Sequence, residues 1–503
     1  MKPSTGEHIQ HLKVAGFTHE DDFLFDASSA CVELRRAQAS WAASSVCMRL
    51  QVLRRFRHLL AEQAETVANS AAGSSLHPVA EILSAEIIPL AEAGRFLERE
   101  AEKLLAPRRV GRRHRPLWLG GLTSVVHREP FGLILVIAPS NYPFFLPGVQ
   151  VLQALAAGNA VLLKPGPDGA RAAHELARLL NTAGLPASLL RVLPESPEAA
   201  QAAIRAGVDK VFFTGSALTG VQILAQLAPH AVPAAMELSG CDAVIIRADA
   251  DLDLAVCALS FGLRLNSGQT CIAPRRVFVT RAIATEFEGR LAQALSDYAP
   301  TPFSPAQRER LAPLLLEALE QGAHFLCGKI HPGGDMVGPL VIAGAKPSLA
   351  LLREDIFAPL LTILTVADDA EAIVLANDCP YALGAAIFSR DEIAARSLAQ
   401  RLNVGGVIIN DLIAPTADAR LPFGGRKLSG FGLTRGPEGL REMTTTKVVI
   451  QRSGRWRPHY DALHADDAAL LRDYLGLVHG GNFRHRWNSF RQVMANLLRR
   501  KKS

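Results

Sequence analysis

Hydrophobic residues follow two different patterns along the chain. Over residues 27–105 they recur at helical spacing, as in Leu50, Leu53, Phe56 and Leu60, which predicts packed helices. After Gly132 short, wholly apolar runs alternate with helical stretches. Runs of this kind are typical of parallel strands that are buried on both faces.

The apolar runs fall into two series, which predict two open α/β domains in tandem, each with a parallel sheet. The first series is residues 133–138, 160–163, 211–213 and 244–246, and the second is 277–279, 361–366, 385–388 and 407–409. Ahead of the first series, Gly120-Gly121 separates residues 116–119 from 122–126. Two glycines suit a two-residue turn with positive φ, so a hairpin is expected there.

Composition is that of a large globular protein, with 49% hydrophobic and 20% charged residues in 503, enough for roughly three domains. No run approaches the about 18 apolar residues of a membrane span, and residues 1–10 are polar, so we expect a cytoplasmic protein. The seven cysteines are an odd number without a CxxC pair, which fits neither a disulfide framework nor a zinc site.

The positive charge is concentrated in the last 52 residues. The whole chain carries +6, but residues 452–503 hold 11 of its 54 Lys and Arg and only 4 of its 48 Asp and Glu. The remainder, with 43 basic and 44 acidic residues, is near neutral. A nucleic-acid partner, which a pI near 9.0 would otherwise suggest, is therefore not expected.

Two polar turns at strand ends contain candidate groups for covalent catalysis. Cys271 lies among small and polar residues directly before an apolar run, where a thiol would have room to attack and backbone N–H groups nearby. A buried structural cysteine would be equally consistent with this context. Asn141, in Pro-Ser-Asn-Tyr-Pro, could donate its amide to an oxyanion or serve as an ordinary turn residue.

Other candidates lie at the ends of apolar runs. Glu237 closes a run of small residues and could act as a general base if burial raised its pKa, or could be a salt-bridged or capping residue. Gly215, Ser216 and Gly220 follow a strand and open a helix, where free N–H groups favour a phosphate, although a plain turn would look similar. Lys164 ends another strand, at the edge where open α/β sheets bind ligands.

In order and spacing, these segments together resemble one family, the NAD(P)-dependent aldehyde dehydrogenases. The resemblance covers residues 27–450, and the motifs around Asn141 and Cys271 are most similar to those of the class with dimeric and fatty-aldehyde members. It is carried by Asn141 in its turn, Lys164-Pro165, Phe213-Thr-Gly-Ser with Gly220, Glu237-Leu-Ser-Gly, Gly268-Gln-Thr-Cys271, Glu354-Asp-Ile-Phe357-Ala-Pro359 and 422–432.

The resemblance implies oxidation of an aldehyde to the acid. Cys271 would attack the aldehyde, Asn141 and the Cys271 N–H would hold the oxyanion, and Glu237 would activate the water that hydrolyses the thioester. NAD or NADP would lie over Ser216 with its adenine ribose near Lys164, while Asp355 and Phe357 would line the nicotinamide side. CoA-acylating chemistry and a catalytically impaired scaffold are the alternatives.

Two departures from the family pattern concern the cofactor. Asp355 stands where members usually carry Glu, so the ribose contact would be weaker or water-mediated. Pro167 stands where many have a Glu that binds the adenosine ribose, and without that carboxylate we expect NADP to be tolerated alongside NAD.

The resemblance also implies a domain plan and partners. We expect a Rossmann-type cofactor domain at 27–110 and 129–238, a catalytic domain at 239–407, a small β element for oligomerisation at 111–128 and 408–451, and a homodimer or higher homo-oligomer. The extension 452–503 contains a helical apolar face among arginines, which could dock on the protein's own body, on a second subunit or on an anionic membrane.

Overall fold

The computed structural model describes residues 26–71, 78–298, 301–330, 336–455, 457–460, 462–464 and 467–500. Within them the chain forms two compact units. One contains the residues up to Arg108 together with Val126–Val448, and the other contains Arg109–Val125 and the residues from Val449 onward. The polar start at residues 1–10 lies outside the described part.

The predicted N-terminal helices are confirmed. Asp26 and Ser45 cap the first two by accepting hydrogen bonds from Ser29 N–H and Met48 N–H, which satisfies amides that a helix start leaves free. Between α4 and α5 the helix widens into a π-helical turn, η1. The elements are α1 (Ala27–Ala43), α2 (Val46–Glu62), α3 (Ala64–Ala71), α4 (Val79–Ile82), η1 (Leu83–Ile87) and α5 (Ile88–Leu105).

The first sheet has six strands in the order β18-β7-β6-β3-β4-β5, parallel except for β18. Chain order reverses between β3 and β6, which is the arrangement of a doubly wound dinucleotide fold. Its members are β3 (Leu133–Ile137), β4 (Ala160–Lys164), β5 (Leu190–Val192), β6 (Lys210–Gly215), β7 (Ala234–Leu238) and β18 (Gly430–Phe431). The helices between its strands are α6 (Phe145–Ala157), α7 (Ala170–Thr182), α8 (Pro197–Gly207) and α9 (Ala217–Leu227).

The second sheet has eight strands, and its central strands are parallel. The order is β10-β12-β13-β9-β8-β15-β16, with β11 paired to β12. Its strands are β8 (Asp242–Ile246), β9 (Pro274–Thr280), β10 (Thr301–Pro302), β11 (His324–Ile330), β12 (Met336–Ala343), β13 (Leu360–Val366), β15 (Gly384–Phe388) and β16 (Gly406–Ile409). The helices are α10 (Leu252–Arg264), α11 (Ala284–Leu295), α12 (Pro305–Glu320), α13 (Asp369–Asn377) and α14 (Glu392–Arg401).

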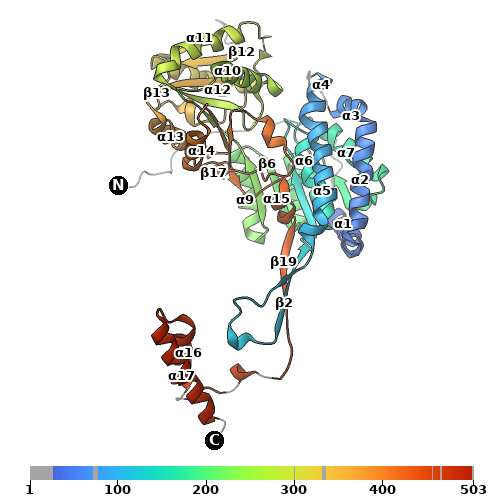
Figure 1. The fold of residues 1–503 in the computed structure, drawn as a ribbon. Coiled ribbons are helices and arrows are strands. Elements are labelled where there is room, and N and C mark those ends of the chain that lie inside the picture. Colours follow the sequence, from blue (N-terminus) through green and yellow to red (C-terminus); the bar gives the residue numbers. More distant parts are fainter. Residues whose placement is uncertain are drawn as a thin grey trace. The chain divides into compact units, whose positions relative to one another are not determined.

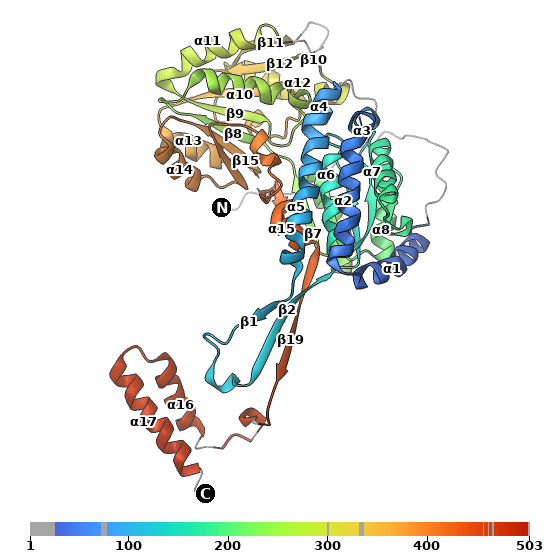
Figure 2. The ribbon, with the colours of Figure 1, turned by 45° about the vertical axis from the view of Figure 1, so that its right-hand side comes forward.

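Figures 1 and 2 show the two sheets with their helices, and α2, α5 and α6 lie side by side next to the first sheet. Each apolar run of the sequence lies in a strand, so the two tandem α/β sheets are confirmed. The grouping of residues 244–246 with the first series is wrong, because this run lies in β8 of the second sheet, between β9 and β15. A uniformly apolar run indicates a buried strand but does not indicate which sheet the strand joins. The domain boundaries expected from the resemblance remain a prediction. No helix among the described residues is both long and apolar enough to cross a bilayer.

The remaining elements form small sheets and helices. The sheet β1-β2-β19 consists of β1 (Arg108–Val110), β2 (Leu122–Pro130) and β19 (Thr444–Arg452), and β14 (Tyr381–Ala382) pairs with β17 (Arg426–Lys427). The helices are α15 (Gly436–Glu442), α16 (Asp467–His479) and α17 (Phe483–Arg500).

The predicted hairpin is only half right. Gly121 has the expected positive φ of 79°, and residues 122–126 are part of β2. The predicted strand before Gly120 is wrong, because Leu117–Leu119 is a turn of 3₁₀ helix. The strand that neighbours β2 is instead β1, at Arg108–Val110. Pro116 at the start of this segment lacks an N–H for a strand ladder, which favours the turn.

Candidate active site

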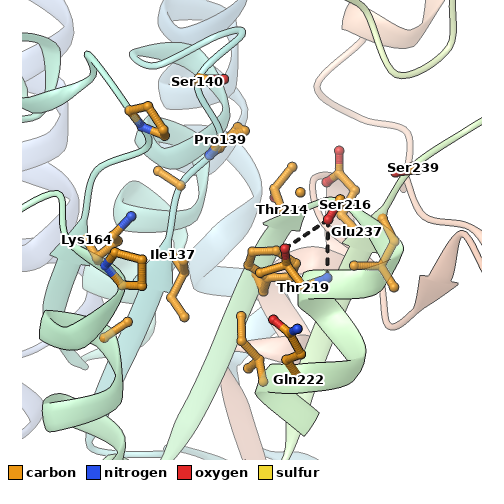
Figure 3. Close-up of a pocket in the computed structure, with 18 of the residues that line it drawn as sticks. Ile137, Pro139, Ser140, Lys164, Thr214, Ser216, Thr219, Gln222, Glu237 and Ser239 are labelled. Atoms are coloured by element: carbon orange, nitrogen blue, oxygen red, sulfur yellow. Dashed lines mark hydrogen bonds between the residues drawn. The ribbon is translucent and has the colours of Figure 1, made fainter. Parts of the chain in front are cut away.

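A cavity of about 480 Å³ opens where β3, β4 and β6 of the first sheet end (Figure 3). This is the point at which strand order reverses, where open α/β sheets bind ligands. Eight of the nine candidate residues line the cavity: Asn141, Lys164, Gly215, Ser216, Glu237, Cys271, Asp355 and Phe357. Residues that are up to 216 positions apart in the sequence are thus brought to one cavity.

Gly220, the ninth candidate, does not line the cavity. It lies in α9, where an added Cβ would come within 2.7 Å of the Leu238 side chain in β7. Such a distance is below any normal carbon contact, so the glycine allows α9 to pack closely on the sheet. Its role in this structure is packing, which fixes the start of α9 beside the cavity.

The start of α9 has free N–H groups of the kind that favour an anion. Ser216 is the N-cap residue, and its hydroxyl oxygen accepts from the Thr219 N–H at 3.2 Å and contacts the Thr219 hydroxyl at 2.9 Å, as Figure 3 shows. Other N–H groups of the first turn have no partner within the helix and carry its partial positive charge. A phosphate group would fit there.

Lys164 supplies a cation near the same end of the cavity. Its side chain is buried, and this burial lowers its pKa, against the opposing effect of Glu195 and Glu198. Of the described residues that line the cavity, the only carboxylates are Glu237 and Asp355. The lining formed by Lys164, Pro167 and Ser216 therefore contains no carboxylate, and Glu195 and Glu198 act on Lys164 from outside the lining. Such a lining fits a phosphorylated cofactor.

The turn that carries Cys271 has an unusual backbone. Asn266, Ser267 and Gly268 have φ values of 49°, 51° and 69°, so three successive residues are left-handed. A non-glycine residue in this region is strained and persists only where its surroundings fix it. A Cβ at Gly268 would also lie 2.7 Å from the backbone of Pro359.

Hydrogen bonds hold this turn against the Asn141 loop. The Asn266 N–H donates to the Glu81 carboxylate at 2.6 Å, and the Asn266 amide donates to the Asn141 carbonyl at 2.8 Å. In return, Asn141 Nδ2 donates to the Gln269 carbonyl at 3.0 Å. An amide nitrogen has two hydrogens, so Asn141 can make this contact and still offer a donor to a ligand.

Arg275 joins the Cys271 turn to the Asp355–Phe357 segment. The guanidinium is 1% exposed, and it donates to the carbonyls of Gly268 at 2.6 Å and of Ala358. Longer contacts reach the carbonyls of Thr270 and Leu360, both at 3.4 Å. A planar guanidinium with several donors can bind two chain segments at once.

The Asp355–Phe357 segment is also held from α12. Phe357 has a φ of 42°, a strained value for a non-glycine residue. Gln307 Nε2 donates to the Phe357 carbonyl at 2.8 Å, and Arg310 donates to the Asp355 carbonyl. Backbone contacts therefore fix the segment, and the Asp355 and Phe357 side chains stay free to line the cavity.

Glu237 has one carboxylate oxygen bound and one free. It lies in β7 and is 4% exposed; Oε2 accepts from the Thr434 hydroxyl at 3.0 Å, while Oε1 has no partner among the described residues. Burial raises the pKa of Glu237, while Arg435 and Thr434 act to lower it. A buried carboxyl group with a free oxygen and a raised pKa can accept a proton near neutral pH.

Burial is also the main factor that raises the pKa of the Cys271 thiol. The negative charges of Glu237 and Asp242 add to the rise, and Arg435 opposes it. Arg435 is itself buried, with its guanidinium 4.2 Å from the Phe423 ring centre and a donor to the Thr416 carbonyl. One buried cation thus favours the charged forms of both candidate groups.

Several residues around the site had no distinguishing pattern in the sequence. Arg275 and Arg435 are ordinary arginines until the fold buries them. Glu81 and Glu86 lie in or beside the π-helical turn η1, and Glu86 accepts from the N–H groups of Phe144 and Phe145 at the start of α6, at 2.8 and 3.0 Å. For Arg275 alone the sequence offers a signal, because this arginine follows the Cys271 turn after only three residues.

These features agree with the comparison to known proteins, which defines the class. The model of the aldehyde dehydrogenase family matches residues 1–449, so the chain belongs to that family. The predicted family, fold and enzyme class are therefore confirmed, and the protein is an oxidoreductase that acts on aldehydes.

Its relatives include enzymes with different named substrates. The chain is 32% identical to 4,4'-diapolycopene aldehyde oxidase of Methylomonas sp over 464 residues, 87% of each chain. It is 32% identical to chloroplastic betaine aldehyde dehydrogenase of Amaranthus hypochondriacus over 481 residues, 91% of this chain and 93% of the relative.

Solved structures of relatives support the cofactor class. Betaine aldehyde dehydrogenase from Staphylococcus aureus in complex with NAD+ superposes with a TM-score of 0.79 at 26% identity, covering 87% of this chain and 90% of that one. An NADP-dependent enzyme of E. coli has a TM-score of 0.79 at 27% identity, covering 85% and 90%. The prediction of NAD or NADP is confirmed at the level of the family.

We expect Arg275→Met to lower kcat by about ten- to a hundredfold, because small displacements of catalytic groups have costs of this order. NAD(P)H absorbance would measure it, with a thermal melt to show that the variant is folded. Arg281→Met removes an exposed arginine and should keep full activity. Unchanged kcat in a folded Arg275→Met variant would show that the hydrogen bonds of Arg275 do not position Cys271.

We expect Glu237→Gln to lower the pKa of Cys271, because it removes a negative charge that disfavours the thiolate. Alkylation of the Cys271 peptide by iodoacetamide, followed by mass spectrometry against pH without cofactor, should then reach half its maximal rate at lower pH. Glu320→Gln, an exposed glutamate, should leave the profile unchanged. A midpoint that stays or rises would contradict the expectation.

Proposed function

We propose that the protein oxidises an aldehyde to the carboxylic acid through a covalent intermediate on Cys271. The observation that carries this proposal is the free, buried Glu237 Oε1 in the same cavity as Cys271 and Asn141. A nucleophile, an amide donor and a proton acceptor are the three groups that the reaction needs.

In the first step the Cys271 sulfur forms a bond to the aldehyde carbon, and the carbonyl electrons move to oxygen. The Asn141 amide and the Cys271 backbone N–H would stabilise that oxyanion, an effect worth about 10² to 10³ in rate for a single donor. The thiol proton has to leave, and Glu237 is the buried group with a free oxygen that can accept it.

NAD or NADP, when bound, supplies the acceptor for the hydride that leaves the former aldehyde carbon. The residues fit such a group: Ser216 and the start of α9 would hold phosphate, Lys164 the adenosine side, and Asp355 and Phe357 the nicotinamide side. The Cys271 thioester that remains is hydrolysed by water. Once the thiol proton has passed from Glu237 to solvent, Glu237 would take a proton from this water as its oxygen attacks the thioester carbon. The same proton would then pass to the departing Cys271 sulfur, which releases the acid and the thiol.

The identity of the acyl acceptor separates this function from CoA-acylating chemistry. Glu237 is retained and buried next to the Thr434 hydroxyl, which favours water as the acceptor.

We also propose that the protein is a homodimer or higher homo-oligomer. Strand β19 is an edge strand of its sheet, and Val448, Val449 and Ile450 along it are 57%, 45% and 61% exposed. Three consecutive exposed apolar side chains on an edge strand are typical of a surface that another chain covers. This supports the expectation that the segment 408–451 contributes to assembly.

We expect Cys271→Ala to lose at least about a thousandfold of the dehydrogenase activity measured by NAD(P)H absorbance, because no other group can form the thioester. Glu237→Gln should lose about 10² to 10³ in steady state. It should still give a burst of one NAD(P)H per site while the thioester accumulates, but a slower burst than hydrolysis alone would predict, because Glu237 also accepts the thiol proton. Glu320→Gln is the control. Activity that survives in Cys271→Ala would overturn the proposal, and rescue of Glu237→Gln turnover only by added CoA would favour the alternative.

We expect the protein to use NADP as well as NAD, because Pro167 stands where a ribose-binding carboxylate would otherwise line the cavity, and the lining beside Lys164 contains no carboxylate. Pro167→Glu should lower the ratio of kcat/KM for NADP to that for NAD by about tenfold or more, through repulsion of the 2′-phosphate. Steady-state kinetics with both cofactors would measure the ratio. A wild-type ratio strongly in favour of NAD, or no change in Pro167→Glu, would contradict this reading.

A further inference from the structure

The C-terminal helices α16 and α17 form a hairpin that lies beyond the residues matched by the family (Figure 2). They pack closely at Gly476, where an added Cβ would come 2.2 Å from the Ser489 hydroxyl. Ser489 and Val493 of α17 are 4% and 9% exposed, and Asn496 Nδ2 donates to Asp473 at 3.2 Å. This face of α17 is therefore used inside the hairpin.

A second face of α17 is largely exposed and is not packed inside the hairpin. Phe483, Trp487, Phe490 and Met494, which we call the aromatic stripe, recur at spacings of four, three and four and so lie on one side of the helix. They are 78%, 52%, 40% and 42% exposed. The Trp487 ring lies 6.3 Å from that of Phe483 and 5.7 Å from that of Phe490, so the stripe is continuous.

Arginines border the aromatic stripe on both sides. At about 100° per residue, Arg484 and Arg491 flank it on one side, each directly after a phenylalanine. Arg486 precedes Trp487 on the other side, where its Nε donates to the Leu477 carbonyl at 3.1 Å, so Arg484 and Arg491 are the arginines offered to a lipid. Helix α17 has five arginines and no acidic residue. Leu497, Leu498, Arg499 and Arg500 lie in or beyond its last turn, where side chains are outside the described part, as are Lys501 and Lys502.

We propose that α17 lies on the surface of an anionic lipid bilayer with the aromatic stripe in the boundary between headgroups and acyl chains. Aromatic rings prefer this boundary, and flanking arginines can extend their guanidinium groups to lipid phosphates. At 1.5 Å per residue the stripe is only about 16 Å long, and it is one side chain wide. Such a narrow apolar strip between cations suits a headgroup layer.

Charge favours an anionic bilayer over the two other surfaces that could cover α17, namely the body of the same chain and a second copy of the protein. The chain before residue 452 has 43 basic and 44 acidic residues, so its excess of one negative charge is too small to attract α17. A second copy would bring the same arginines opposite the first, which like-charge repulsion disfavours. Anionic lipid provides an apolar layer and an excess of negative charge together. The proposal does not depend on the chemistry of the cavity.

Sedimentation of the full-length protein with vesicles tests it. We expect pelleting with vesicles that contain phosphatidylglycerol, weak pelleting with pure phosphatidylcholine, and release as salt is raised. The double variant Trp487→Glu/Phe490→Glu should reduce partitioning about tenfold or more, and Arg484→Gln/Arg491→Gln should reduce it and weaken its salt dependence. Ile393→Glu, at an 82% exposed residue of α14, is the matched control and should pellet like the wild type.

Dehydrogenase activity and light scattering complete the design. The stripe variants should keep the wild-type activity and mass, which shows that the loss of pelleting is not a loss of folding. Absence of wild-type pelleting with phosphatidylglycerol, equal pelleting with the neutral lipid, or equal pelleting of Trp487→Glu/Phe490→Glu would each overturn the proposal. A smaller mass of that variant without wild-type pelleting would assign the stripe to a second copy instead.

Discussion

The buried guanidinium of Arg275 links the two chain segments on which the cavity depends. Removing a cation from water is costly unless its donors are satisfied. Here backbone carbonyls of the Cys271 turn and of the segment after Phe357 accept from the two terminal nitrogens, while Nε has no partner among the described residues. Both segments have left-handed, non-glycine residues. The free energy of keeping Arg275 hydrogen-bonded therefore helps to hold backbone conformations that neither segment would adopt alone.

The electrostatics of the cavity follow from the same lack of water. Burial favours the neutral forms of Cys271 and Glu237, and the negative charge of Glu237 further disfavours the Cys271 thiolate. Arg435 counteracts both effects from a position against the Phe423 ring. A single fixed cation in a low-dielectric site can shift both groups together, which water-exposed charges could not do because of screening.

The strands and the helix starts could be predicted from the sequence because they depend on local patterns. Uniform apolar runs gave β3, β4, β6, β8 and β9, and short motifs placed Cys271, Glu237, Asn141 and Ser216 at their ends. Gly220 shows the limit of a motif, because its match is real but its structural role is helix packing.

The residues that sequence reasoning missed act over long separations. Glu81 bonds to Asn266 and Arg275 to Ala358, and no period or spacing encodes such pairs. The wrong strand before Gly120 has another cause: the glycine pair predicted a turn correctly, but which segment pairs with β2 is decided by tertiary structure rather than by the turn.

The π-helical turn Leu83–Ile87 begins two residues after Glu81, which accepts from Asn266, and contains Glu86, which accepts at the start of α6. A π-helical turn holds more residues than an α-helical one, so the directions of these two carboxylates depend on how many residues separate them. Deletion of one residue there would rotate Glu86 away from α6 without changing any side chain. The alignment of the Asn141 loop with the Cys271 turn therefore depends on the number of residues between Glu81 and Glu86. A comparison of residue types at single positions would not detect this dependence.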